Sequence, residues 1–340
     1  MRNIENKNEK GGAPRRLRLG FIGTGWIGRM RLQSLLQAEM MESCTVYDSS
    51  VIAAAAAAAL SADISVGESF ADLLNGDLDG LVIATPNAQH AEQCLQAFAG
   101  GKAVFCQKPL ARTLTETQRV VDAARAADRL LSVDFCYRYL TGMAQLKEMI
   151  GAGELGEVFS ADLIFHNGYG PDKPWFYEMC SAGGGCVMDL GIHLIDLALW
   201  LLGDGPVEQV SSSLFQSGKK LQPPYEVVED YAMAEFNLKD THLRLCCSWN
   251  LHAGREAVIK AQFYGTKGGA AVRNVNGSFY DFEICRFDST RERIIGGYPD
   301  SWGGRALLDW AAQLGAGSGF DSRVEQVVQV AEVIDRIYCR

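Results

Sequence analysis

The segment from Gly183 to Asp196 carries two carboxylates and one imidazole at the spacing of a helix. If the chain is helical from Cys186 onward, Asp189 and His193 stand one turn apart on a single face. Asp196 follows three residues later and lies near the same stripe. Such groups are costly to bury on an otherwise apolar helix. These residues alone support an acid–base site and a structurally satisfied core histidine equally.

A second candidate is Lys108, which stands at the end of a predicted strand in the run Cys106-Gln107-Lys108-Pro109. The proline stops the strand and stiffens the backbone at the carboxyl edge of the sheet. An ammonium held there can stabilise negative charge that develops on a reacting oxygen. A lone lysine is most often a solvated surface charge, so only its position makes Lys108 a candidate.

Together these residues suit hydride transfer from a secondary alcohol to a nicotinamide, which requires a base for the hydroxyl proton. Histidine has an ordinary pKa of about 6.5 and suits that role near neutral pH. We therefore assign His193 as the base, and as the acid in the reverse direction. Lys108 would hydrogen-bond the reacting oxygen, and Asp189 would orient the substrate or the imidazole. Asp196 would act on the site through its neighbours.

The dinucleotide would be bound by a glycine-rich turn between an apolar strand and a helix, in the run Gly23-Thr24-Gly25-Trp26-Ile27-Gly28. Gly23 would allow the tight turn, Gly25 the approach of the pyrophosphate, and Gly28 close packing of helix on strand. The pyrophosphate would then meet the helix N-terminus, where free N–H groups and the helix dipole favour anions.

Asp48 ends the second predicted strand, 20 residues beyond Gly28. A carboxylate there can accept hydrogen bonds from the adenosine ribose and would repel a 2′-phosphate, which favours NAD over NADP. Ser49 follows and could hydrogen-bond a phosphate, but no arginine comes directly after it to neutralise the charge. The alternative, a surface aspartate opening a turn, explains the strand, glycines and acid together less well.

Two further strand ends should lie beside the cofactor, because open α/β sheets bind ligands at their carboxyl edge. One carries Thr85-Pro86-Asn87, in which Pro86 fixes the turn and Asn87 could cap the next helix. His90 lies near that loop and is better explained as structural than as catalytic. The other end brings Gln107 and Lys108 to the nicotinamide side.

The elements that position these residues alternate between strands and helices from Leu17 to about Phe135. This alternation predicts a doubly wound parallel sheet, an α/β Rossmann fold. The predicted strands are Leu17–Ile22, Cys44–Tyr47, Ile64–Val66, Leu81–Ala84, Ala103–Cys106 and Leu130–Val133. The predicted helices are Ile27–Ala38, Val51–Leu60, Phe70–Leu74, Ala88–Phe98 and Leu114–Ala127.

After Tyr137 the pattern predicts an α+β domain with a large, mostly antiparallel open sheet. Its expected strands are Val158–Phe165, Val207–Gln216, Val227–Leu238, Leu243–Leu251, Val258–Tyr264 and Ser278–Phe287. Its expected helices are Met143–Ile150, Cys186–Leu202, Arg305–Leu314 and Arg323–Tyr338. We therefore expect a mobile tail at 1–16, a cofactor domain at 17–136, and a substrate-binding and oligomerisation domain at 137–340.

Aromatic and hydrogen-bonding residues enter the expected cleft from this second half. Tyr137 and Arg138 follow the last strand of the first sheet, and the loop before the Asp189 helix carries Tyr169 and Trp175. Aromatic faces beside polar groups suit the C–H faces and hydroxyls of carbohydrates. Loop packing or a subunit contact explains any one of them equally well.

Bulk composition excludes several classes of protein. The chain has 340 residues, is 48% hydrophobic and carries a net charge of −9, which argues against a nucleic-acid partner. Its longest apolar run, Val51–Leu60, is too short to span a bilayer. The ten cysteines include no CxxC pair, so we expect no metal centre and a reducing, cytoplasmic location.

The glycine fingerprint, the Thr85-Pro86 turn with His90, the Lys108-Pro109 pair and the GGGxxxDxGxHxxD segment occur in that order from Leu17 onward. Together they resemble the glucose–fructose oxidoreductase/inositol dehydrogenase/MocA family. The resemblance implies a Rossmann domain, an α+β domain whose open sheet forms a homo-oligomer, and NAD(P)-dependent chemistry on sugars or cyclitols. It also implies that Lys108, Asp189 and His193 form the catalytic group.

One residue departs from that family pattern. The family usually has glutamate before the lysine and proline, where this chain has Gln107. The lost charge could change how the nicotinamide ribose is held, or shift the pKa of Lys108. Two alternatives to a simple dehydrogenase stay open: cofactor-assisted chemistry without net redox, such as glycoside cleavage or epimerisation, and a catalytically idle NAD-binding regulatory protein.

Overall fold

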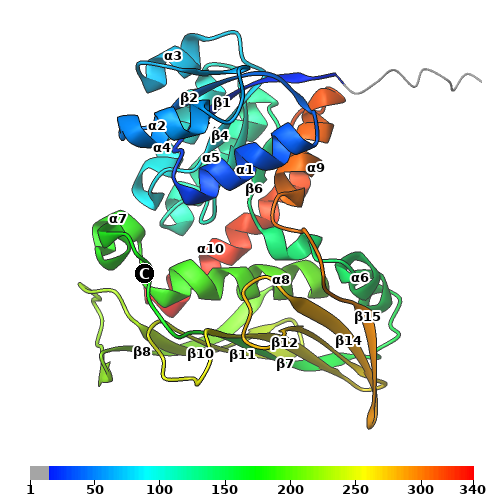
Figure 1. The fold of residues 1–340 in the computed structure, drawn as a ribbon. Coiled ribbons are helices and arrows are strands. Elements are labelled where there is room, and N and C mark those ends of the chain that lie inside the picture. Colours follow the sequence, from blue (N-terminus) through cyan, green and yellow to red (C-terminus); the bar gives the residue numbers. More distant parts are fainter. Residues whose placement is uncertain (1–14) are drawn as a thin grey trace, which may run out of the picture.

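The computed structural model describes residues 15–340, which contain two β-sheets with helices packed around and between them (Figure 1). Of the predicted tail at 1–16, only Arg15 and Arg16 fall inside the described residues. The guanidinium of Arg15 bonds the carboxylate of Asp79 at the start of the first sheet.

The first sheet has six parallel strands in the order β3-β2-β1-β4-β5-β6. It confirms the predicted doubly wound fold, with the strand order reversing between β1 and β4. Its strands are β1 (Leu17–Ile22), β2 (Met41–Tyr47), β3 (Ile64–Val66), β4 (Gly80–Ile83), β5 (Ala103–Cys106) and β6 (Leu131–Val133). Its helices are α1 (Trp26–Gln37), α2 (Val51–Ala58), α3 (Phe70–Asn75), α4 (Asn87–Ala99) and α5 (Leu114–Ala127).

The second sheet has nine strands in the order β15-β14-β13-β12-β7-β11-β10-β8-β9, all antiparallel except for the β7–β11 pair. This confirms the predicted large open sheet. Its strands are β7 (Val158–Asn167), β8 (Val207–Gln216), β9 (Lys219–Lys220), β10 (Tyr231–Leu238), β11 (Thr241–Ser248), β12 (Ala257–Gly265), β13 (Gly269–Asn274), β14 (Phe282–Asp288) and β15 (Arg291–Gly296).

Helices cover one face of this second sheet, on the side that faces the first domain (Figure 1). Along β7 the buried positions alternate, as a sheet with one covered face requires. Helix α10 contacts α8, β8 and α5, so it joins the two domains. The helical elements of this half are η1 (Cys136–Tyr139), α6 (Met143–Gly151), η2 (Pro174–Tyr177), α7 (Met179–Ala182), η3 (Val187–Gly191), α8 (Ile192–Leu202), α9 (Arg305–Gly315), η4 (Ser322–Glu325) and α10 (Gln326–Ile337).

Helix α9 lies late in the sequence but packs against the first sheet. Its Trp310 is fully buried, with its ring centroid 5.9 Å from that of Phe105 on β5. A Cβ atom at Gly80 would stand 2.8 Å from the Trp310 ring, so this strand position needs glycine. The division at residues 136 and 137 stays a prediction.

Several predicted elements differ from the observed ones. The expected helix over Cys186–Leu202 begins as one π-helical turn, η3, and continues as α8. Strands β13 and β15 lie outside every expected strand. The first is short and made largely of glycine and alanine, whereas β15 is exposed along most of its length, so neither shows the apolar alternation of a half-buried strand.

Within the described residues, one helical stretch, Met179–Leu202, is long and apolar enough to cross a membrane. In the structure 78% of its most apolar window is buried inside the protein. This stretch therefore packs mainly inside the protein.

Candidate active site

A cleft of about 1600 Å³ runs along the carboxyl edge of the first sheet and is closed on its other side by the second domain. Residues that follow β1, β2, β4, β5 and β6 all reach it. This is the position at which doubly wound sheets bind their ligands. The cleft contains most of the predicted site residues. It is larger than the roughly 300–1,000 Å³ of a typical small-molecule site, so it has room for a cofactor together with a substrate.

The glycine turn after β1 has the geometry that a dinucleotide requires. Gly23 has a φ of +86°, and a Cβ atom on Gly28 would lie 2.2 Å from the Gly23 carbonyl oxygen. A Cβ on Gly25, by contrast, would meet no atom of residues 15–340 within 4 Å. The positive φ of Gly23 and its close approach to Gly28 keep the turn tight. The open side of Gly25 lets a phosphate approach the backbone. Thr24 is buried behind the turn, while Trp26 and Ile27 line the cleft.

Asp48 lies at the edge of the same cleft, directly after β2. One of its carboxylate oxygens accepts the Thr24 amide at 2.7 Å and the other accepts the Ser50 amide at 2.8 Å. These two bonds fix the carboxylate beside the glycine turn and leave lone pairs for further donors. Ser49 also lines the cleft.

The turn after β4 is linked to the second domain through Asn87 and to the turn after β5 through His90. Asn87 is the first residue of α4 rather than its cap, and its amide donates to the Ala182 carbonyl at 2.8 Å, across the domain boundary. His90 is buried with one ring nitrogen 2.7 Å from the Thr85 oxygen and the other 2.7 Å from the Pro109 oxygen. Burial lowers the pKa of His90. The imidazole therefore bridges the Thr85 and Pro109 turns, which agrees with a structural role.

Lys108 meets Asp189 across the cleft. Its Nζ donates to the Asp189 carboxylate Oδ1 at 2.8 Å and to the Asp189 backbone oxygen at 2.7 Å. The other carboxylate oxygen, Oδ2, accepts from the indole N–H of Trp249 at 3.1 Å. The two oxygens of the Asp189 carboxylate therefore bond Lys108 and Trp249. The carboxylate orients the ammonium of Lys108 rather than the imidazole of His193. Trp249 lies within the predicted strand Leu243–Leu251, where no local pattern marks it as a site residue.

His193 lines the same cleft, one position after the start of α8. Its Nδ1 is buried and has no hydrogen-bond partner among residues 15–340. Burial, reinforced by the positive charges of Lys108 and Arg31, lowers the pKa of His193 well below its usual value. The ring is therefore neutral at physiological pH and can accept a proton.

A buried glutamate holds the turn from which Asp189 and His193 project. The Glu229 carboxylate accepts the amides of Gly185 at 3.0 Å and Val187 at 2.8 Å. It also accepts the Tyr338 hydroxyl at 2.8 Å. These bonds satisfy free N–H groups at the start of the π-helical turn, a feature often found at functional sites. The position of Asp189 therefore depends on Glu229 and, through it, on Tyr338, which follows α10.

Asp196 and Arg138 pair with each other instead of with Lys108, Asp189 or His193. Asp196 is buried, and its carboxylate accepts from the Arg138 Nε at 2.8 Å and from a second nitrogen of the same guanidinium. Arg138 also donates to the Gln326 side chain at 3.1 Å. Because its donors are used this way and it does not line the cleft, the predicted substrate contact of Arg138 is not supported.

Aromatic residues line part of the cleft. The Tyr137 ring is 5.0 Å from the His193 ring and 5.2 Å from the Trp302 ring, between centroids. Tyr169 and Trp175 also line the cleft, as expected. Trp302 was not predicted as a site residue, because it lies in a glycine-rich run, residues 296–304, outside every predicted helix and strand.

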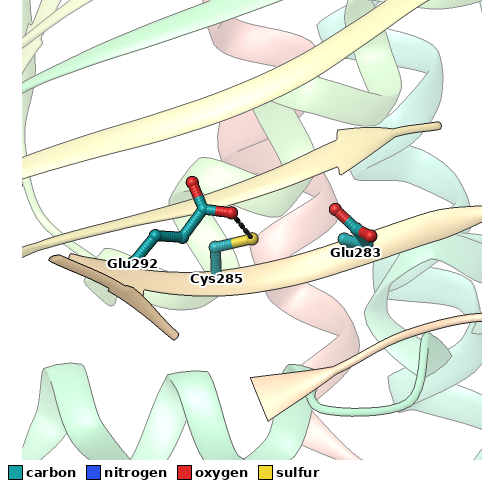
Figure 2. Close-up of side chains that lie close together, drawn as sticks. All are labelled: Glu283, Cys285 and Glu292. Atoms are coloured by element: carbon teal, nitrogen blue, oxygen red, sulfur yellow. Dashed lines mark hydrogen bonds between the residues drawn. The ribbon is translucent and has the colours of Figure 1, made fainter. Parts of the chain in front are cut away.

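A separate cluster on the second sheet brings together Glu283, Cys285 and Glu292 (Figure 2). The guanidinium of Arg273 bonds Glu283 at 3.0 Å and also pairs with Glu292. This arginine already supplies the positive charge that a metal ion would bring to the carboxylates. The cluster is therefore explained as an ion-pair network, and the expectation of no metal centre stays a prediction.

The parallel sheet with its reversed strand order, glycine turn and strand-end carboxylate defines a dinucleotide-binding Rossmann domain. Residues 17–135 match the family described as "Oxidoreductase family, NAD-binding Rossmann fold". Residues 143–271 match the "GFO/IDH/MocA C-terminal domain". The chain belongs to the GFO/IDH/MocA family of oxidoreductases.

Relatives of this chain are named as sugar and cyclitol dehydrogenases. It is 30% identical over 271 residues to D-glucoside 3-dehydrogenase of Escherichia coli K12, covering 75% of this chain and 77% of that one. It is 33% identical over 193 residues to inositol 2-dehydrogenase 3 of Saccharopolyspora erythraea. That match covers 55% of this chain and only 54% of the relative.

The fold is shared with solved structures. A levoglucosan dehydrogenase in complex with NADH and L-sorbose superposes with a TM-score of 0.78 at 21% identity, covering 96% of this chain and 97% of the other. Another neighbour, a 3-ketoreductase, was solved with NADP. These neighbours show the fold, so cofactor preference rests on the residues of this chain.

Proposed function

We propose that this protein transfers hydride between a secondary alcohol carbon of a sugar or cyclitol and the nicotinamide of NAD. The observation that carries the proposal is the convergence of Lys108, Asp189 and His193 on a cleft that also contains the glycine turn. Lys108 comes from the first domain and the other two from the second. A substrate held between the domains would meet all three.

His193 takes the hydroxyl proton on oxidation, because its ring is neutral and lines the cleft that would hold the substrate. Lys108 donates to the reacting oxygen and stabilises its developing negative charge. Asp189, itself held by Trp249, keeps the ammonium aimed into the cleft. When bound, NAD supplies the hydride acceptor.

The cofactor would be held by the residues along the first sheet's carboxyl edge. Asp48 would accept from the adenosine ribose hydroxyls and disfavour a 2′-phosphate, so NAD is preferred to NADP. The phosphates would meet the turn around Gly25. The residues proposed to bind or shape this site are Gly23, Thr24, Gly25, Trp26, Ile27, Gly28, Asp48, Ser49, Thr85, Pro86, Asn87, His90, Gln107 and Lys108.

The substrate would lie against Tyr137, Tyr169 and Trp175. Their rings offer flat apolar surfaces to the C–H faces of a sugar ring, while Lys108 and His193 address one hydroxyl. Burial raises the pKa of Tyr137 well above its usual value, so its hydroxyl stays protonated. The tyrosine can therefore donate a hydrogen bond at any physiological pH.

Two further properties follow from the same proposal. We infer a homo-oligomer formed through the outer face of the second sheet, because the helices cover only its inner face (Figure 1). We also infer a cytoplasmic location. All ten cysteines lie within the described residues and are free, and seven of them are buried, as a reducing compartment permits.

The test is a panel of sugars, cyclitols, amino sugars and their keto forms, assayed for NADH formation or consumption with NAD and NADP compared. At least one substrate should be oxidised faster with NAD, and Lys108→Ala and His193→Ala should abolish that turnover. Turnover without accumulation of NADH would instead indicate transient oxidation. Binding of NAD with no turnover of any substrate, and no effect of the two variants, would contradict the proposal.

A further inference from the structure

Asp134, directly after β6, is a buried carboxylate that the proposed mechanism does not use. Its Oδ2 accepts the Nε of Arg31 at 2.6 Å and also the side-chain amide of Gln107. Both partners are themselves buried. One carboxylate therefore joins α1, the end of β5 and the end of β6.

The other oxygen of this carboxylate is unused. Oδ1 of Asp134 is buried and accepts no hydrogen bond from any residue between 15 and 340. Asp134, Arg31 and Gln107 all line the large cleft. A buried charged acceptor without a donor is costly, and in native structures it indicates a partner that completes it.

The order of the strands indicates which end of the cofactor would lie nearest to Asp134. Along the carboxyl edge the sheet runs β2-β1-β4-β5-β6, so Asp48 and Asp134 lie on opposite sides of the glycine turn. With the adenosine ribose at Asp48 and the phosphates at Gly25, the nicotinamide nucleoside extends toward Lys108 and Asp134. That nucleoside carries ribose hydroxyls and an amide N–H group, all of which are donors.

We propose that Asp134 Oδ1 accepts a hydrogen bond from the nicotinamide nucleoside of NAD, and that Asp134 supplies the carboxylate that this chain lacks at Gln107. This inference rests on the proposed function only in taking NAD as the bound cofactor. It makes Asp134 a cofactor-binding residue and Arg31 a residue that positions it.

The amide of Gln107 fits the proposed exchange of roles, in which position 134 carries the carboxylate and position 107 the amide. It donates to Asp134 Oδ2, which a glutamate at 107 could not do when ionised. Two carboxylates within hydrogen-bonding distance would repel each other, even with the buried Arg31 beside them. An amide at 107 and a carboxylate at 134 keep one negative charge for one arginine.

The experiment measures binding of NADH and of ADP by calorimetry to four proteins: wild type, Asp134→Asn, Gln107→Glu and the double exchange Gln107→Glu/Asp134→Asn. ADP lacks the nicotinamide nucleoside and reports on the adenosine end. We expect Asp134→Asn to weaken NADH binding roughly 10- to 100-fold, the value of a hydrogen bond to a charged group, with ADP binding unchanged. We expect Gln107→Glu to bind NADH no better than wild type.

The double exchange moves the carboxylate from position 134 to position 107 and so keeps one carboxylate near Arg31, because Arg31 and Gln107 bond the same oxygen of Asp134. It therefore also tests whether loss of the Arg31 ion pair alone explains the weaker binding expected of Asp134→Asn. It should recover NADH affinity to within about fivefold of wild type, where tenfold corresponds to about 1.4 kcal/mol. Unchanged NADH binding in Asp134→Asn, or equal weakening of NADH and ADP, would overturn the proposal.

Three other outcomes also decide the matter. A double exchange that binds NADH as weakly as Asp134→Asn would overturn the exchange of roles. If Asp134→Asn does not fold, tighter NADH binding by Gln107→Glu would overturn the proposal. Binding needs no sugar, so a protein that binds NADH through Asp134 but oxidises nothing would refute the proposed function and leave this inference standing.

Discussion

The ammonium of Lys108 lies 2.8 Å from the carboxylate of Asp189, although 81 residues separate them in the chain. Lys108 follows the last residues of β5 in the first domain, whereas Asp189 belongs to the π-helical turn of the second. Their contact bridges the two domains at the cleft. It fixes the direction of the ammonium and makes the site depend on how the domains pack.

Replacing Lys108 by methionine keeps the length of the side chain and removes its charge. We expect kcat/KM for the identified substrate to fall roughly 100- to 1000-fold, because the developing alkoxide loses its stabilising donor. The loss should be larger in kcat than in NADH affinity, because Lys108 acts on the reacting oxygen. Steady-state kinetics check this, with the exposed Lys219→Met as the matched control. A Lys108→Met enzyme with more than half of wild-type activity would contradict the assigned role.

The acid limb of the pH profile should reflect His193. Burial, Lys108 and Arg31 lower its pKa, and the base is competent only when neutral, so kcat/KM for oxidation should stay high below pH 6.5 and fall only at still lower pH. Lys108→Met removes one of the positive charges that lower the pKa of His193. The acid limb of its residual activity should therefore lie at higher pH than that of wild type. A wild-type limb centred at or above the ordinary histidine value would count against this reading.

Trp249 should act through Asp189. Trp249→Phe keeps an aromatic ring but removes the indole N–H that donates to the Asp189 carboxylate, so we expect kcat to fall roughly 10-fold. KM for NAD should stay close to wild type, because a positioning residue acts on the chemical step. The melting temperature should fall, because the smaller ring leaves a cavity at a buried position. Trp200→Phe, which does not line the cleft, serves as the control for the loss of ring size. Equal losses in both variants would show a general packing effect.

Asp48 should set the choice of cofactor. In Asp48→Ala the repulsion of a 2′-phosphate and the acceptor for ribose hydroxyls are both lost, so the ratio of kcat/KM for NAD over NADP should fall at least roughly 10-fold. Glu42→Ala, an exposed acid on the same strand, should leave the ratio unchanged. An unaltered ratio in Asp48→Ala would refute the assignment of NAD specificity to this carboxylate.

Gly185 should be intolerant of any side chain. A Cβ atom there would lie 1.9 Å from the Glu229 carbonyl oxygen, so Gly185→Ala should lower the free energy of unfolding by about 2 kcal/mol or more and displace Asp189. Gly151→Ala is the matched control, because a Cβ at that helix end meets no described atom within 4 Å. Denaturant titrations of both variants check this, and similar stabilities would contradict it.

Much of the fold followed from local patterns. Strand–helix alternation predicted the parallel sheet, and the run Gly23 to Gly28 predicted the dinucleotide turn, because turn chemistry and periodicity depend on residues a few positions apart. The same reasoning missed β13 and β15, whose residues lack a clear apolar alternation. It also extended one helix through what is a π-helical turn.

The sequence by itself determined which residue types stand at the ends of strands, and so identified Lys108, Asp48 and the Asp189 segment as candidates. Only the tertiary structure decided their partners. Asp196 was assigned near the catalytic stripe, yet it pairs with Arg138, 58 residues away. Arg31 and Asp134, 103 residues apart, meet beneath Gln107. Such pairs depend on how strand ends and helices pack, and spacing along the chain does not specify the distance between them.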